Sequence, residues 1–328
     1  MKILVTGSSG HLGEALVRRL RAEGRPVVGV DLLESEFTDV AGSIAERAVV
    51  RRAMHGVGAV LHAATLHKPH VGTHARQEFV DTNITGTLNL LEEAREAGVG
   101  PFIFTSTTSA FGSALTPEAG RPAAWVTEEV RPVPRNIYGV TKTAAEDMVE
   151  LFHRKFGMTN LILRTSRFFP EEDDHAEKRQ AFADDNLKVN EFLYRRVEIE
   201  DVVSAHLLAL EKAAALRFGR YIISATTPFT EEDMGELREN AETVVRRRVP
   251  EYQEEYQRRG WKMFRGIDRV YVNEKARREL GWRPVHDFAT VLERLKAGKE
   301  WRSELAQEVG SKGYHAEKFA MGPYPVEG

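Results

Sequence analysis

Tyr138 and Lys142 stand four residues apart in the stretch NIYGVTKTAAEDMVELF. Residues at this spacing share one face of a helix, so the two side chains are expected to be neighbours. An ammonium group beside a phenol stabilises the phenolate and lowers a pKa that is ordinarily about 10. The pair is therefore a candidate base for taking a proton from an alcohol. Taken alone, a tyrosine and a lysine at this spacing are more often an ordinary surface pair.

A run of hydroxyl side chains precedes this pair. The sequence TSTTSAFG follows an apolar, strand-like stretch that ends near Phe104. Residues just after a strand of a parallel sheet line the crevice in which ligands collect. One hydroxyl from residues 106 to 108 is thus placed to hold a substrate oxygen opposite Tyr138. Together these groups suit the removal of a proton from an alcohol whose carbon loses hydride.

An acceptor for that hydride is indicated by the opening stretch MKILVTGSSGHLG. Three apolar residues lead into glycines at 7, 10 and 13, and an amphipathic helical pattern then runs to Gly24. Such glycines let a phosphate approach the backbone at a helix N-terminus, where free N–H groups bind pyrophosphate. The next apolar strand, PVVGVD, ends in Asp31, which is placed to accept the hydroxyls of an adenosine ribose. A glycine triplet alone often marks only a tight turn, and the complete order of elements is what favours dinucleotide binding.

Asp31 also indicates which dinucleotide is bound. Its carboxylate repels a 2′-phosphate, and no Lys or Arg occurs from 32 to 36 to offset that charge. We therefore expect NAD rather than NADP, unless a basic residue from elsewhere in the fold reverses the preference.

The composition narrows the range of partners. The chain of 328 residues has 46 basic and 49 acidic side chains and a formal net charge of −3, so no excess positive charge is available to hold nucleic acid or an acidic membrane. It has no cysteine, which excludes disulfides, thiolate catalysis and thiolate metal sites. The apolar run at 3 to 5 leaves no room for a signal sequence, and no run is long enough to span a bilayer. We expect a cytoplasmic protein acting on a small molecule.

The order of strand-like and helical stretches predicts the fold. Helical patterns such as ITGTLNLLEEAREAG alternate with continuous apolar runs at 27–30, 57–61, 101–105, 160–163 and 220–223. This alternation is typical of a parallel sheet covered by helices on both faces. We predict a Rossmann-type α/β fold, a doubly wound parallel sheet with a smaller, mainly helical C-terminal substrate lobe. The predicted division is 1–165 with 197–225 for the NAD-binding domain, and 166–196 with 226–328 for the lobe.

Seven segments resemble, in order, the motifs of the extended short-chain dehydrogenase/reductase superfamily, in particular its NAD-dependent epimerase/dehydratase branch. They are TGSSGHLG (6–13), HAA (62–64), NITGT (83–87), FTSTTSAFG (104–112), YGVTK (138–142), EIEDVVSAHLLALE (198–211) and ARRELGWRPVHDF (276–288). The resemblance covers nearly the whole chain and leaves little room for chance agreement. It implies a helical C-terminal lobe that contacts substrate, and often a homodimer.

The resemblance assigns roles to individual residues. It implies that Tyr138 is the acid/base, that Lys142 lowers its pKa and holds the ribose, and that Thr107 binds the reacting oxygen. It implies NAD as the cofactor, contacted by Gly7, Gly10, His11, Leu12, Gly13, Asp31, Ser43, Ile44, Ala63, Ala64, Asn83, Tyr138 and Lys142. The expected substrate contacts are Thr107, Thr108, His67 and Arg167.

Three departures from the family's pattern bear on the ligands. Where the family has an Asp that meets adenine, VAGSI offers Ser43, with Ile44 left to pack on the ring. Arg167 stands in LRTSRFFPE where an asparagine is expected, and its planar fork suits a carboxylate or phosphate. The insertion between Pro170 and the strand-like VEI at 197 is shorter than in nucleotide-sugar epimerases. We therefore expect a smaller substrate, such as a polyol, a free sugar or a sugar acid; the short segment is reminiscent of uronate dehydrogenases.

A histidine cluster allows two interpretations. His67, His70 and His74 fall within TLHKPHVGTHARQEF. We interpret this stretch as a loop beside the substrate rather than a metal site, because Pro69 and Gly72 break a helix and no second ligand cluster is visible. No metal is expected.

Charged residues farther along the chain also bear on the cleft. Together with the histidine loop, Arg167 would make the cleft cationic, and Arg195 and Arg196 either add to that charge or are exposed. The acidic stretch EEDD at 171–174 lacks the glycine spacing of a calcium site, so we interpret it as a solvated loop.

These residues predict NAD-dependent oxidation or reduction of a secondary alcohol on a sugar or sugar-acid-like small molecule. The alternative is an NAD-dependent sugar or nucleotide-sugar epimerase with retained cofactor, since the two activities differ in substrate rotation and cofactor release rather than in core residues. Dehydratase chemistry is disfavoured because Thr108 and Ser109 stand where an acid pair usually follows. A catalytically silent dinucleotide sensor is a further rival, although such proteins tend to lose the reactive Tyr or Lys.

Overall fold

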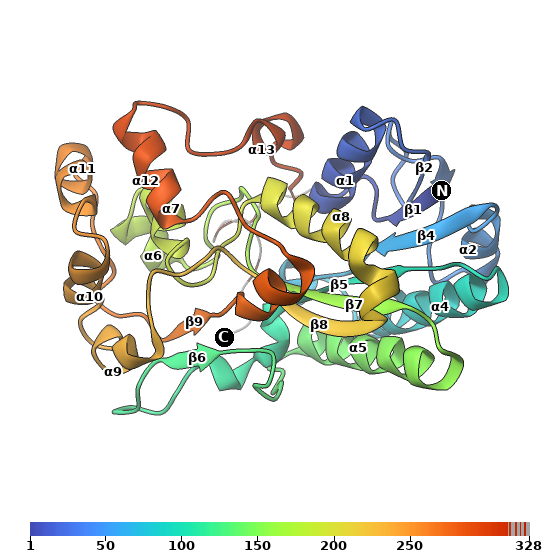
Figure 1. Ribbon diagram of the computed structural model, residues 1–328, viewed down its shortest axis with the longest axis horizontal. Helices are drawn as coiled ribbons and strands as arrows, with labels where there is room; N and C mark the ends of the chain where they lie inside the picture. Colours follow the sequence, from blue (N-terminus) through green and yellow to red (C-terminus); the bar gives the residue numbers. More distant parts are fainter. Residues whose placement is uncertain (314, 316–318, 320–321, 323–324, 326–328) are drawn as a thin grey trace.

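A seven-stranded sheet forms the larger part of the molecule. The computed structural model describes residues 1–313 together with 315, 319, 322 and 325. The strand order is β3-β2-β1-β4-β5-β7-β8, and each neighbouring pair is parallel (Figure 1). The strands of this sheet are β1 (Lys2–Thr6), β2 (Val27–Asp31), β3 (Val40–Ala41), β4 (Val57–His62), β5 (Phe102–Thr107), β7 (Asn160–Thr165) and β8 (Phe218–Ile223). The predicted doubly wound parallel sheet is confirmed.

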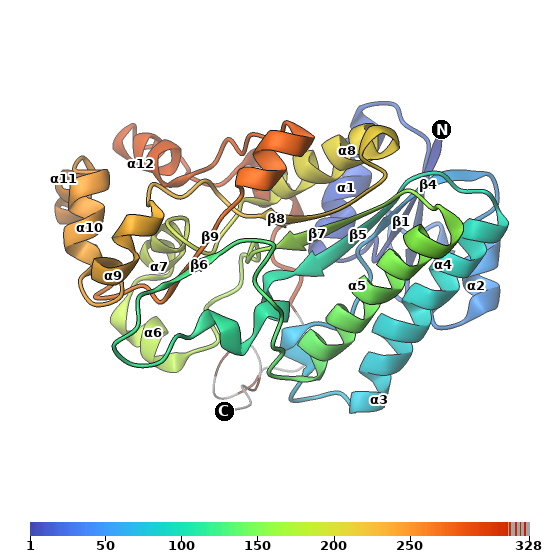
Figure 2. The same cartoon turned by 60° about the horizontal axis from the view of Figure 1, so that its bottom comes forward.

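Helices cover both faces of this sheet, which is why its strands are almost continuously apolar. On one face lie α1 (His11–Ala22) and α8 (Ile199–Leu216), and α13 (Glu304–Val309) packs against both of them. On the other face lie α2 (Arg47–Ala53), α4 (Gly86–Glu96) and α5 (Ile137–Phe156), as Figure 2 shows. A short helix, α3 (Arg76–Phe79), leads through a π-helical turn (Val80–Thr85) into α4. A separate cluster of buried apolar side chains fills each interface.

A smaller, mainly helical lobe has a hydrophobic core of its own. Its helices are α6 (Ala176–Ala181), α7 (Asp184–Glu191), α9 (Met234–Leu237), α10 (Ala241–Arg248), α11 (Tyr252–Arg259) and α12 (Phe288–Lys296). The lobe also carries a parallel two-stranded sheet of β6 (Ala124–Val126) and β9 (Arg269–Tyr271), which the sequence analysis missed. These strands have only three residues each, too few to show a pattern. The division of the chain into two domains remains a prediction.

Two of the later sequence motifs hold the lobe to the sheet. The Asp201 carboxylate, in the first turn of α8, accepts hydrogen bonds from the backbone N–H groups of Val285 at 2.8 Å and His286 at 2.9 Å. The indole of Trp282, which is fully buried, donates to the Asp201 carbonyl at 3.1 Å. The start of α8 and the LGW segment therefore lock together, although they are far apart in the sequence.

One expected strand is wrong. The stretch VEI at 197 is not a strand; Arg196 beside it forms a single bridge with Arg167, and Glu198 then caps α8 by accepting a hydrogen bond from the Glu200 N–H at 2.6 Å. Val197 and Ile199 are buried in the core, and Glu198 between them caps α8.

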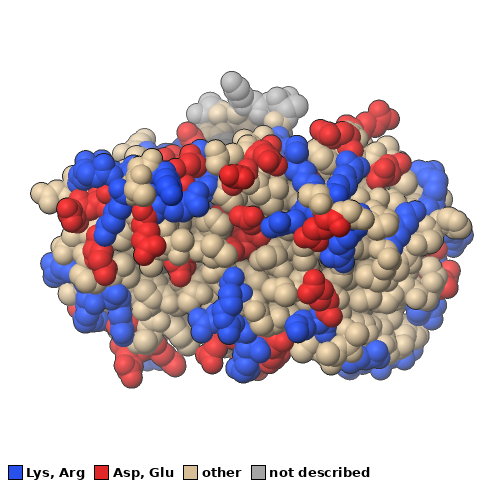
Figure 3. Space-filling model, turned by 45° about the horizontal axis from the view of Figure 1, so that its top comes forward, with Lys and Arg blue, Asp and Glu red and all other residues tan. Residues whose placement is uncertain are grey.

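On the face shown in Figure 3, Lys and Arg side chains are interspersed with Asp and Glu side chains. Among the described helices, none combines the length and the apolar composition needed to cross a membrane.

Candidate active site

Two adjoining pockets lie at the carboxyl ends of the central strands, where the strand order reverses between β1 and β4. The first, called here the cofactor pocket, has a volume of about 250 Å³ and is lined by the glycine turn, Asp31 and the residues after β4. The second, called the substrate pocket, has a volume of about 190 Å³ and is lined by the residues after β5 and β7. Tyr138 and His67 line both pockets, so the phenol stands where they meet.

The start of α5 positions Tyr138. The Asn136 side chain caps this helix by accepting a hydrogen bond from the Gly139 N–H at 3.0 Å, which places Tyr138 in the first turn. Thr107 ends β5, and its hydroxyl accepts a hydrogen bond from the Ser109 N–H at 3.0 Å. The same threonine hydroxyl is hydrogen-bonded to Tyr138. The predicted Thr107, Tyr138 pair is thus brought together at the junction of the pockets.

Burial dominates the acid–base behaviour of this centre. It raises the pKa of Tyr138 to about 12, against which the Thr107 hydrogen bond acts. Burial lowers the pKa of Lys142 to about 7, while the charge of Glu146, one turn along α5, acts to raise it. The Lys142 ammonium donates to the Thr105 carbonyl at 2.7 Å and lies 4.1 Å from the centre of the Phe104 ring. The sequence led us to expect that Lys142 lowers the pKa of Tyr138, but the causes of the pKa shift are burial and the Thr107 hydrogen bond.

The glycine turn has the geometry that a dinucleotide needs. Gly7 has a φ of +72°, and a Cβ there would lie 2.8 Å from backbone atoms of Ala64. A Cβ at Gly13 would lie 1.8 Å from the Gly7 carbonyl, so the turn closes only with glycine at this position. No side chain caps the start of α1, whose first N–H groups are therefore left for an anion. These residues fit the diphosphate of NAD.

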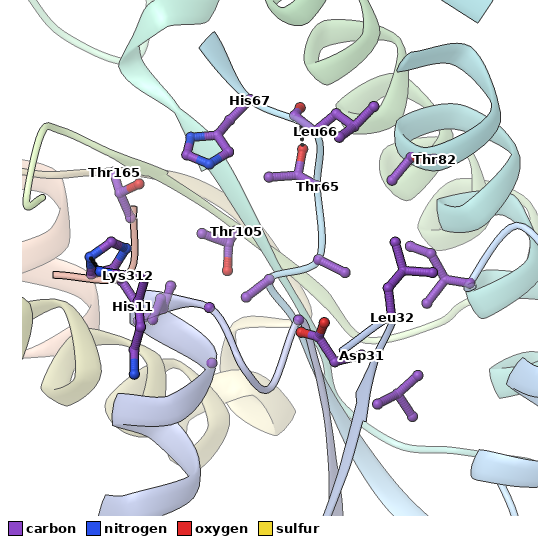
Figure 4. A pocket seen from close by; sticks show the side chains of 18 of the residues that line it. His11, Asp31, Leu32, Thr65, Leu66, His67, Thr82, Thr105, Thr165 and Lys312 are labelled. Carbon is purple, nitrogen blue, oxygen red and sulfur yellow. Dashed lines mark hydrogen bonds between the residues drawn. The ribbon is translucent and has the colours of Figure 1, made fainter. Parts of the chain in front are cut away.

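Asp31 lies at the far end of the cofactor pocket from His11 and Thr165 (Figure 4). Its carboxylate accepts hydrogen bonds from the backbone N–H groups of Ser9 and Leu33, each at 3.0 Å. These contacts hold it at the end of β2, where a ribose is expected. Of the residues predicted to contact the cofactor, all except Asn83 line this pocket.

Asn83 is buried behind the wall of the cofactor pocket. Its amide oxygen accepts hydrogen bonds from the Leu66 N–H at 2.9 Å and the Thr65 hydroxyl at 2.8 Å, and its amide nitrogen donates to the Leu66 carbonyl and to Thr141. The structure thus joins Asn83 to the loop after β4 and to α5. Through these bonds it positions the chain that carries His67.

The predicted substrate contacts Thr107, Thr108, His67 and Arg167 all line the substrate pocket. The Arg167 guanidinium is charge-paired: it lies 3.1 Å from the Asp173 carboxylate and 3.7 Å from that of Asp174. Asp174 also pairs with Lys68. The acids therefore balance the positive charge on this side of the pocket before any substrate arrives.

The interpretation of EEDD at 171–174 as a solvated loop is wrong for three of its four residues: only Glu172 is exposed, at 67%, and the Glu171 side chain is 8% exposed. Asp173 and Asp174 are only 2% and 4% exposed. Arg195, 3.2 Å from Asp173, and Arg196, 3.0 Å from Glu191, are also largely buried, so neither is an exposed surface residue. The sequence could not show this, because the cations that accompany the acids come from other segments.

The histidine rings of this loop pack edge to face against one another. The rings of His67 and His70 lie 4.8 Å apart, as do those of His70 and His74, and His315 lies 5.4 Å from His70. Burial lowers the pKa of His67 well below its usual value. His67 lines both the cofactor pocket and the substrate pocket, whereas His70, His74 and His315 are not among the described residues that line these two pockets.

Several pocket residues were not among the predicted contacts. Arg269 and Tyr271 of β9 line the substrate pocket, and Phe168 and Phe169 line both pockets. Lys312 and Gly313 line the cofactor pocket from the C-terminal part of the chain. Phe168 and Phe169 directly follow Arg167 after β7, whereas Arg269, Tyr271, Lys312 and Gly313 reach the site only because distant segments fold onto the sheet.

Comparison with known proteins agrees with this geometry. The family described as NAD dependent epimerase/dehydratase matches residues 3–223. The chain is 30% identical over 237 residues to sterol demethylase protein B of Methylococcus capsulatus, an alignment covering 68% of this chain and 70% of that protein. It is 24% identical over 336 residues to a UDP-glucose 4-epimerase of Corynebacterium glutamicum (89% and 94% covered) and 29% identical over 186 residues to a uronate dehydrogenase of Pseudomonas syringae (52% and 60%).

One solved structure is similar to this chain over almost its full length. A short-chain dehydrogenase/reductase superfamily protein of Agrobacterium tumefaciens with bound NAD superimposes with a TM-score of 0.64 at 25% identity, covering 94% of this chain and 99% of that one.

Proposed function

The chain belongs to the NAD-dependent epimerase/dehydratase family of extended short-chain dehydrogenases/reductases, and from that premise we propose that it oxidises a secondary alcohol of a sugar or sugar-acid-like molecule through Thr107, Tyr138 and Lys142. The observation that carries the proposal is the place of Tyr138. Its phenol stands between the cofactor pocket and the substrate pocket, hydrogen-bonded to Thr107.

Each protein group has a separate task in this reaction. Thr107 and Tyr138 hold the substrate hydroxyl between them, and Tyr138 takes its proton. NAD, when bound, supplies the hydride acceptor and a positively charged ring. A nearby positive charge favours the phenolate, which matters because burial raises the pKa of Tyr138 to about 12 even though the Thr107 hydrogen bond acts against it. In this proposal Lys142 binds the nicotinamide ribose, and the charge of Glu146 favours the charged form of the lysine.

The substrate pocket favours a polar, compact molecule. Lys68, Arg167, Arg195 and Arg269 line it together with acidic residues from 171–174. Such mixed charge suits hydroxyl groups and a single carboxylate better than an apolar ring. A relative named uronate dehydrogenase supports a sugar acid, and the short segment after Pro170 argues against a bulky nucleotide.

An epimerase is the second candidate. Relatives named UDP-glucose 4-epimerase align over nearly the whole chain. The core groups would be the same, but an epimerase must keep its cofactor until the hydride returns to the substrate. Retention of NAD is therefore the property that separates the two candidates.

The test is to incubate the purified protein with NAD and a panel of sugars, polyols and sugar acids and to follow NADH formation. A Tyr138→Phe variant serves as the control: we expect turnover to fall by about 10²- to 10⁴-fold, the usual contribution of a general base, with NAD binding nearly unchanged. Turnover that survives in this variant contradicts the assignment of Tyr138. If NADH never accumulates, the nucleotide released on denaturation is quantified, and near-stoichiometric retained NAD directs the search to sugar inversion.

We also propose that the enzyme is a homodimer formed through α4 and α5. What supports this interface is that α4 and α5 pack against each other and expose apolar side chains: Leu88 on α4 is 39% exposed, and Val140 and Leu151 on α5 are 50% and 43% exposed. Its cytoplasmic location stays a prediction from the sequence.

A further inference from the structure

The C-terminal part of the chain returns to the edge of the cofactor pocket. Residues 311–313, called here the latch, follow α13 and the turn at Gly310. Lys312 and Gly313 line the cofactor pocket, and Figure 4 shows the Lys312 side chain beside His11 at the start of α1. The latch thus lies against the turn that is expected to hold the diphosphate, although almost the whole chain separates the two in sequence.

The Glu171 carboxylate joins the latch to this turn. One of its oxygens accepts hydrogen bonds from the Ser311 hydroxyl at 2.9 Å and from the Gly313 N–H at 3.3 Å. The same oxygen lies 3.0 Å from Nε2 of His11, and both side chains are less than a tenth exposed. Although burial opposes ionisation, the hydrogen bond and charge of His11 lower the pKa of Glu171 to about 2. Glu171 is therefore charged at neutral pH, and hydrogen bonds to a charged acceptor are the strong kind.

A second contact fastens the latch to α1. The Lys312 ammonium pairs with the Glu14 carboxylate, which is 3% exposed and also binds Arg18 at 2.8 Å. The Lys312 ammonium points along α1 rather than into the pocket (Figure 4), so the backbone and the side-chain stem form the wall. The latch therefore contacts α1 in two ways: through Glu171, which lies beside His11, and through the pair of Lys312 with Glu14.

We propose that the latch closes the diphosphate end of the cofactor pocket and that Glu171, as a positioning residue, sets how fast NAD leaves. Glu171 comes from the segment that follows β7 and also lines the substrate pocket, so one carboxylate links the substrate side of the site to cofactor release. A closed latch retains NAD between turnovers, as an epimerase requires, whereas a readily opened latch lets NADH leave, as a dehydrogenase requires. The inference depends on NAD use and not on the reaction proposed above.

The test is the rate at which NADH leaves the full-length protein. Enzyme loaded with NADH is mixed with excess NAD in a stopped-flow instrument, and the loss of NADH fluorescence is followed. In Glu171→Gln we expect release to be at least about tenfold faster, the factor that corresponds to one lost charge-assisted hydrogen bond, with the association rate nearly unchanged. The matched control is Glu308→Gln on α13, a 59% exposed glutamate that lines neither pocket, which should release NADH at the wild-type rate.

Variants on the latch itself keep the inference testable if Glu171→Gln folds poorly. Ser311 is exposed, so Ser311→Ala should fold normally and release NADH a few-fold faster; Lys312→Ala should act in the same direction. A merely structural loss would lower the amount of NADH bound rather than speed its release. Wild-type release rates in the Ser311 and Lys312 variants would overturn the proposal even if Glu171→Gln is faster, because the side chains that fasten the latch would then have no effect on release. These rates need no substrate, so a failed substrate panel leaves this test intact.

Discussion

The cofactor pocket and the substrate pocket lie side by side but are built differently. The cofactor pocket is lined by the glycine turn and by residues at the ends of adjacent strands, among them the carboxylate of Asp31. The substrate pocket rests on a chain of paired charges, in which Asp173 and Glu191 stand between the guanidinium groups of Arg167, Arg195 and Arg196. Local chain geometry thus makes the first site, and charge compensation between distant segments makes the second.

The largest effect is expected from breaking the charge chain. Asp173 is 2% exposed and lies 3.1 Å from Arg167 and 3.2 Å from Arg195. In Asp173→Ala both arginines lose this partner, and we expect the free energy of unfolding to fall by about 3 kcal/mol, the lower end of the range for a broken buried pair, because the two guanidinium groups keep some exposure. Urea denaturation of the wild type and the variant measures this difference in the free energy of unfolding.

The exposed neighbour Glu172 provides the control for that comparison. Its side chain is 67% exposed, and Glu172→Ala should change stability by less than about 0.5 kcal/mol, as is usual for a surface substitution. If Asp173→Ala and Glu172→Ala lost similar amounts of stability, the paired charges around Asp173 would not be what stabilises the substrate pocket.

A smaller effect, confined to the cofactor pocket, is expected from Asp31→Asn. The substitution keeps one oxygen for a backbone N–H but removes the charge that faces the ribose. We expect NAD to bind about 10- to 100-fold more weakly, because a hydrogen bond to a charged group contributes roughly 1.5–3 kcal/mol. The free energy of unfolding should change little. The ratio of the NAD and NADP affinities should fall, which titration calorimetry with both nucleotides measures.

Glu34→Gln, three residues along in the same exposed loop, is the matched control for charge. It should leave both affinities unchanged. An Asp31 variant that binds NAD as tightly as the wild type would mean that the ribose is held elsewhere.

The smallest effect is expected from Arg167→Gln. Asp173 and Asp174 already balance this guanidinium, so it contributes only part of its charge to a substrate. For an acidic substrate we expect KM to rise by up to about tenfold, equivalent to roughly 1.4 kcal/mol, and for its neutral analogue hardly at all. Equal increases for the two compounds would rule out recognition of a carboxylate by Arg167.

Sequence reasoning succeeded where one short stretch contains the whole signal. The glycines at 7, 10 and 13 and the acid at the end of the next strand predict the cofactor pocket, because the turn requires residues without a Cβ. Tyr138 and Lys142 are likewise found from their spacing on one helix. The parallel sheet follows from the continuous apolar strands that burial on both faces requires.

The same reasoning failed where a residue's environment comes from another part of the chain. Asp173 and Asp174 look like a solvated acidic run until Lys68, Arg167 and Arg195 surround them. The pKa of Tyr138 could not be predicted from the sequence either, because burial rather than Lys142 dominates it.

The sequence by itself determined the sheet, the glycine turn and the position of Tyr138 beside Lys142 on one helix, because each depends on the order and spacing of residues within a few turns of chain. Only the tertiary structure decided the balance of charge around Arg167 and the latch that Glu171 ties across the cofactor pocket. Electrostatic interactions depend on distance in space, and a buried charge is stable only beside its partner. Nothing in the sequence marks Glu171 and Ser311 as such partners before the chain has folded.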